Sequence, residues 1–142
     1  MTDKINNERV VGQTKDVGFQ IGVRKTFDIP IQQAWGLITS VEGINLWLGE
    51  SADFHLEPGE AYQINDGATG EVRVVKPGSH FRLTWQPQGW QRPSLIQVRV
   101  IPSGRKTMIS FHQEHLPGQP EREQRRQHWQ KVLETLQKQL DG

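Results

Sequence analysis

The feature that most constrains this chain is one long amphipathic helix predicted at its C-terminal end, over residues 120–140. Apolar residues recur there at helical spacing and form a single stripe along one side, comprising Trp129, Val132, Leu133, Leu136 and Leu140. This stripe has to be buried, and the preceding strands are the only partner available. A sheet that closes over such a helix leaves an interior space of the kind that holds small apolar ligands.

Short alternating strands and two short helices precede this terminal helix. A first strand is predicted over Phe19–Phe27, and helices follow from Pro30 to about Ser40 and from Val41 to about Leu48. The connections between the later strands contain Pro-Gly, Asp-Gly and Ser-Gly dipeptides, which suit tight turns, so sequential strands are expected to pair antiparallel. These later strands are predicted over Asp53–Glu57, Glu60–Asn65, Gly70–Lys76, His80–Gln86, Ser94–Ile101 and Lys106–Leu116.

This order of elements predicts an α+β helix-grip fold. A curved antiparallel sheet and two short helices would wrap around the long C-terminal helix. One face of the sheet is clearly apolar, because Phe81, Leu83 and Trp85 alternate with polar residues. The connection Gln86–Pro93 is too long for a minimal hairpin and displays Trp90 among polar residues, as loops that border a site often do.

Composition excludes several classes of protein. A chain of 142 residues is expected to form one domain, and a formal net charge of +1 provides no field that would attract nucleic acid or an anionic membrane. The absence of cysteine excludes disulfides, thiol catalysis and thiolate metal sites, and it indicates a cytoplasmic location. Residues 1–18 are mostly polar, so we expect a flexible N-terminal arm there, neither signal peptide nor membrane anchor, followed by one domain over residues 19–142.

Several segments, taken in order, resemble a known superfamily. They are Ile29–Trp35, Ile44–Gly49, Gly70–Val74, Phe81–Trp85, Phe111–Leu116 and Gln127–Trp129 with Leu133. In their order and spacing they resemble the START-like superfamily, also called SRPBCC. Within it, the chain is similar to the C-terminal domain of the activator of the Hsp90 ATPase. The resemblance extends over roughly Phe19–Leu140 and implies a hydrophobic cavity between the sheet and the long helix.

This implied cavity leads to the first functional hypothesis, the binding of a small apolar or aromatic molecule. Trp35 and Trp129 are expected on the buried faces of their helices, whereas Trp47 and Trp90 are expected at the rim of the cavity. The residues predicted to line the ligand are Trp35, Trp47, Ile64, Phe81, Leu83, Trp85, Trp90, Val98, Phe111 and Trp129.

Catalytic and metal chemistry have weaker support. The sequence contains no Gly-x-Ser-x-Gly motif, phosphate-binding glycine loop or dinucleotide fingerprint, so no catalytic residue and no cofactor is assigned. His112, Glu114 and Tyr62 are candidates for acid-base chemistry, with solvated roles favoured for each. Because His112 and His115 would point to opposite faces of a strand, no metal site is predicted.

The arginines near the start of the terminal helix form a second charged feature. Arg122, Arg125 and Arg126 are interleaved with glutamates such as Glu123. This pattern is interpreted as a solvated helix face, not as a nucleic-acid patch.

Two alternatives to ligand binding remain open. A co-chaperone-type module that binds a chaperone or another protein would have a filled interior and an exposed patch around Trp47 and Trp90. A cyclase-like or hydrolase-like enzyme is less favoured and would need His112 or Glu114 inside the cavity. The ligand-binding hypothesis itself expects a closed cavity lined by Ile64, Trp85, Val98 and Trp129.

Overall fold

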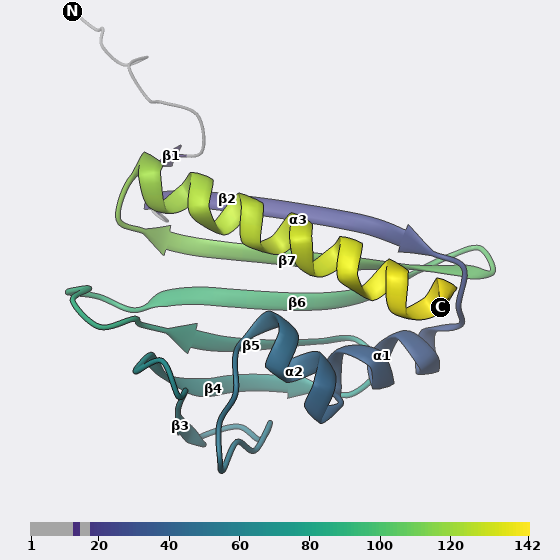
Figure 1. Cartoon of the computed structure of the whole chain (residues 1–142), viewed down its shortest axis with the longest axis horizontal. Coiled ribbons are helices and arrows are strands. Elements are labelled where there is room, and N and C mark those ends of the chain that lie inside the picture. Colours follow the sequence, from purple (N-terminus) through teal and green to yellow (C-terminus); the bar gives the residue numbers. More distant parts are fainter. Residues whose placement is uncertain (1–12, 15–17) are drawn as a thin grey trace, which may run out of the picture.

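The computed structural model describes residues 13–14 and 18–142 as an α+β fold, in which helices cover one face of a single sheet (Figure 1). The predicted arm falls mostly on residues outside the described part. The elements in chain order are β1 Gln13–Thr14, β2 Gly18–Phe27, α1 Ile31–Thr39, α2 Val41–Trp47, β3 Ala61–Gln63, β4 Thr69–Lys76, β5 His80–Trp85, β6 Ser94–Ser103, β7 Lys106–Leu116 and α3 Gln119–Asp141.

The strands form one antiparallel sheet in the order β1-β2-β7-β6-β5-β4-β3. From β3 to β7 each strand pairs with its neighbour in sequence, as the short turns predict. The pairing of β2 with β7, in contrast, joins strands from opposite ends of the chain, with Phe27 opposite Thr107. This pairing places β2 under α3 and confirms the curved helix-grip fold.

The long helix α3 crosses β2, β7 and β6, while α1 and α2 lie on the same face in front of the other half of the sheet (Figure 1). Four residues of its apolar stripe are buried and Leu140 is half-buried. Pro120 occupies the first turn, where its missing N–H removes no helical hydrogen bond. None of the helices within the described residues combines the length and apolarity that a membrane span requires.

Two local predictions are wrong. Residues 53–57 do not form a strand. Instead the chain just before them follows the edge of β3, where the backbone N–H of Asn65 donates to the carbonyl oxygen of Glu50 at 2.8 Å. At the end of β7, His115 has a φ of 63°, so it breaks the alternation and becomes exposed while Leu116 is buried.

Candidate functional site

Three of the seven aromatic residues predicted to line a ligand pack against one another under α1 and α2 instead. Trp35 meets Phe81 edge-on with ring centroids 5.7 Å apart, and Trp47 lies 5.3 Å from the same ring. Trp47 is 1% exposed, and its indole N–H donates to the carbonyl oxygen of Ile38 at 2.8 Å. Its expected place at a rim is therefore wrong, because α1 supplies a buried acceptor for the one polar atom of the indole.

The centre of the sheet is also closed. Leu83, Val98 and Phe111 are fully buried on the inner face. Phe111 stacks on Trp129 of α3, with ring centroids 4.6 Å apart and ring planes 12° apart. The ring of Trp129 thus fills the space that a ligand would need at the middle of the grip.

A buried polar network lies beside this stack. The side-chain oxygen of Gln113 accepts hydrogen bonds from Trp129 Nε1 at 3.0 Å and from Arg125 Nε at 2.8 Å. Its amide nitrogen donates to Ser94 Oγ at 2.9 Å, and that hydroxyl donates to the carbonyl oxygen of Trp85 at 2.8 Å. Every side-chain polar atom of Gln113 is therefore engaged, which fixes the amide in one orientation. We call Arg125, Gln113, Ser94, Trp85 and Trp129 the Arg125 cluster.

Arg125 is the unusual member of this cluster. Its guanidinium is buried, although the residue as a whole keeps some exposure. The guanidinium carbon lies 3.9 Å from the centroid of the Trp85 ring and 5.0 Å from that of Trp129, both within the range of cation–π attraction. Burial lowers the pKa of Arg125 to about 9, while Tyr62 and Asp66 act in the opposite direction, so the side chain stays charged at neutral pH.

Tyr62 and His128 are two titratable groups near the cluster, and the charge of Arg125 acts on the pKa of each. Burial raises the pKa of Tyr62, and its hydroxyl donates to the carbonyl oxygen of Thr84. Gly70 permits this approach, because a Cβ at that position would collide with the Thr84 carbonyl oxygen and the Tyr62 ring. His128 Nε2 donates to the carbonyl oxygen of Trp47 at 2.9 Å, and burial, with Arg125 as a lesser cause, lowers the pKa of the imidazole to about 4.

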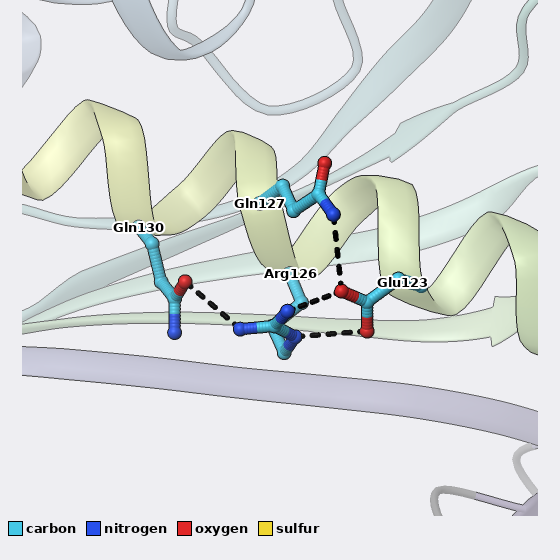
Figure 2. A network of polar contacts seen from close by, with 4 residues as sticks. All are labelled: Glu123, Arg126, Gln127 and Gln130. Atoms are coloured by element: carbon cyan, nitrogen blue, oxygen red, sulfur yellow. Dashed lines mark hydrogen bonds and ion pairs between the residues drawn. The ribbon is translucent and has the colours of Figure 1, made fainter.

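The prediction that the arginines of α3 form a solvated face holds for Arg126 but is wrong for Arg125. Figure 2 shows the exposed side of α3, where Arg126 Nε donates to Glu123 at 2.9 Å and Gln127 donates to the same carboxylate at 3.1 Å. These hydrogen bonds to Arg126 and Gln127 lower the pKa of Glu123 to about 2. Arg125 precedes Trp129 by four residues, so it extends the buried stripe by one turn. This four-residue spacing is the feature of the sequence that could have predicted the burial of Arg125.

Trp90 covers the edge of the cluster. It meets Trp85 edge-on at 5.4 Å and is half-buried, in a loop held by a 2.6 Å hydrogen bond from Gln86 Nε2 to the Trp90 carbonyl oxygen. Trp85, Trp90, Phe111 and Trp129 are therefore the predicted ligand residues that come together at this end of α3.

The hollows described by the structure lie elsewhere. A groove of about 790 Å³ runs along the sheet edge and includes Ile64 and Tyr62, and one of about 720 Å³ separates β2 from α3 beside Leu133. Trp85, Val98 and Trp129 line neither of these two grooves, and they line neither of two smaller hollows. The closed cavity expected between the sheet and α3 is thus not among the described hollows.

His112 and Glu114 lie on the outer face of the sheet. Their side chains are 3.8 Å apart, and they line a small groove of about 220 Å³ that also includes Arg82. His112 Nε2 lies 2.9 Å from the side-chain oxygen of Gln20. The sheet separates them from the Arg125 cluster, so they do not meet the condition for acid-base chemistry in the interior.

Solved structures share this fold at low sequence identity. CalU16 from Micromonospora echinospora is 20% identical with a TM-score of 0.72, covering 82% of this chain and 73% of that chain. CV1439 from Chromobacterium violaceum is 17% identical with a TM-score of 0.73, covering 87% and 97%. PFC0360w, an HSP90 activator from Plasmodium falciparum, is 16% identical with a TM-score of 0.72, covering 86% and 96%. A search of curated proteins gave no match.

The sequence also matches a family over most of its length. Residues 28–141 correspond to the family described as Activator of Hsp90 ATPase homolog 1-like protein. The matched range contains α1, α2, every strand from β3 to β7 and all of α3. It therefore includes the Arg125 cluster, and the chain belongs to the family of Activator of Hsp90 ATPase homolog 1-like proteins.

Proposed function

We propose that this protein binds a small aromatic or apolar molecule at the Arg125 cluster, beneath the N-terminal half of α3. The observation that carries the proposal is a set of aromatic rings arranged around polar groups that are already fixed by hydrogen bonds. Gln113 and Ser94 orient one another, and Trp85 and Trp129 supply the rings. Aromatic walls with a few fixed polar groups are typical of small-molecule sites.

A ligand would reach this site only after the Trp90 side chain moves aside. The loop that carries it is held by the Gln86 side chain and by a 3.2 Å hydrogen bond from the Trp90 N–H to the carbonyl oxygen of Pro87. Because Trp90 is only half-buried, its movement exposes Trp85 at a small cost in apolar burial. A ligand admitted by this movement would pack between the Trp85 ring and the ring of the displaced Trp90, which would cover it.

The test uses N-phenyl-1-naphthylamine, a neutral apolar probe whose fluorescence rises in apolar surroundings. We expect saturable binding to the native protein. Trp90→Ala should weaken it about tenfold or more, because the ligand loses an aromatic contact. Val41→Ala is the matched control, since Val41 is a large apolar residue that is 74% exposed on α2. Equal binding by the wild type and Trp90→Ala, or an equal loss in both variants, would reject the site.

A second candidate, stimulation of an Hsp90-type ATPase, is favoured by the family match and by the likeness to PFC0360w. Val41 and Val74 are the exposed large apolar residues within the described part of the chain, and they offer little apolar surface to a partner. If this candidate is correct, the protein should raise the steady-state ATP turnover of a purified Hsp90 in proportion to its concentration. An unchanged turnover at a large excess of folded protein would rule it out.

A further inference from the structure

We infer that the molecule bound at the Arg125 cluster is an anion, an aromatic or apolar carboxylate whose carboxylate group pairs with the terminal nitrogens of Arg125. This inference rests on the proposed function and adds the charge and chemical class of the ligand. Its basis is the guanidinium group, which is buried and charged, has one of its three nitrogens engaged, and has no acidic partner within the described part of the chain.

The hydrogen bonds of the cluster leave one side of the guanidinium open. Arg125 Nε is taken by the side-chain oxygen of Gln113, and that oxygen also accepts from Trp129. The two terminal nitrogens, Nη1 and Nη2, make no hydrogen bond to any residue between 18 and 142. Their four N–H groups match the oxygens of a planar carboxylate, which arginine binds through parallel hydrogen bonds.

Among residues 18–142, no acidic side chain forms an ion pair with this charge. The ion pairs of arginine within the described residues join Arg73 to Glu71 and Arg126 to Glu123, and none includes Arg125. Asp66 influences the pKa of Arg125 through its charge, but its carboxylate is exposed and accepts a hydrogen bond from the Ala68 N–H at 2.9 Å. Beyond the Gln113 oxygen and the two indole rings, this buried cation has no anionic partner among the described residues, and a bound anion would supply one.

The surroundings of Arg125 decide what kind of anion fits. Trp85 and Trp129 lie against the guanidinium, and Trp90 stands at the edge, so the body attached to the carboxylate is flanked by indole rings. A small hydrated anion such as inorganic phosphate would leave these rings without contacts. An aromatic or apolar carboxylate would engage both the charge and the rings.

The experiment compares two ligands that differ in charge and hardly in shape, 2-naphthoate and 2-naphthamide. Isothermal titration at pH 7.5 in low-chloride buffer should show naphthoate binding to the wild type at least about tenfold tighter than naphthamide. Arg125→Met should abolish this preference and leave naphthamide binding unchanged. Its thermal unfolding midpoint should equal or exceed that of the wild type, because the variant removes a buried unpaired charge.

Arg122→Met is the matched control. Arg122 lies three residues earlier on α3, and its Nε donates to the carbonyl oxygen of Gln20 at 2.7 Å, outside the cluster. This variant should keep the preference for naphthoate. Equal affinity of the wild type for both ligands would overturn the inference while the proposed function stands. Loss of the preference in Arg122→Met as well would overturn it as a non-specific charge effect. Failure of both naphthalenes to bind would also overturn it, and the N-phenyl-1-naphthylamine titration then decides the proposed function separately.

Discussion

Replacing Trp129 by alanine is expected to lower the free energy of unfolding by about 3 to 5 kcal/mol. The side chain is fully buried, stacks on Phe111 and donates to Gln113. Its removal opens a cavity at the centre of the grip and separates α3 from β7. Chemical denaturation followed by far-ultraviolet circular dichroism measures the loss, and a loss below about 1 kcal/mol would show that this stack contributes little.

Trp129→Phe provides a milder comparison in case the alanine variant does not fold. It keeps a ring that can stack on Phe111 but removes the indole N–H. The oxygen of Gln113 still accepts from Arg125, so no buried acceptor is left without a partner. We therefore expect a loss of about 1 to 2 kcal/mol, clearly smaller than that of Trp129→Ala.

Stability is expected to fall as the pH drops from 6.5 to about 4, because His128 is held neutral in the fold. The pKa of its imidazole is lowered from 6.5 to about 4 by burial and by the nearby charge of Arg125, against the opposing hydrogen bond to the Trp47 carbonyl oxygen. Between these values the unfolded chain binds a proton that the folded protein does not, so acid favours unfolding. The full effect is on the order of 3 kcal/mol, of which about 2 kcal/mol is expected by pH 5.

Unfolding free energies of the wild type and His128→Gln at pH 7 and pH 5 isolate this contribution. Glutamine cannot gain a proton, so the variant should lack most of the loss. His80, whose pKa is lowered by desolvation and by Arg99, is present in both proteins and cancels in the comparison. Identical pH dependence in the two proteins would mean that His128 does not titrate in this range.

Local patterns account for the elements of this fold. Helical spacing from Trp129 to Leu140 predicts the buried side of α3, and alternation from Phe81 to Trp85 predicts the inner face of β5. Residues 53–57 also alternate, yet they form no strand. Alternation of apolar and polar residues predicts which side chains would share a face of a strand. The strand itself forms only if a neighbouring strand offers free backbone N–H and carbonyl groups. The edge of β3 is occupied instead by Glu50 and Ser51.

The candidate site could be predicted only in part. Trp85 and Trp129 were identifiable because large aromatic residues stood at inward positions. Arg125 and Gln113 stand at inward positions too, one helical turn before Trp129 and two residues after Phe111. Their charge and polarity indicated solvent, and this outweighed the positional signal, which is the spacing of Arg125 from Trp129 and of Gln113 from Phe111.

The sequence alone was sufficient to predict α1, α2, α3 and the strands from β2 to β7, with most of the faces they bury, because these depend on periodicities within a short stretch of chain. Only the tertiary structure decided that a guanidinium lies buried against two indoles and that Trp47 is enclosed. Desolvation depends on what the rest of the chain places around a group. Gln113, Trp85 and Arg125 come from β7, β5 and α3, and they meet only once β2 pairs with β7 and the sheet closes under α3.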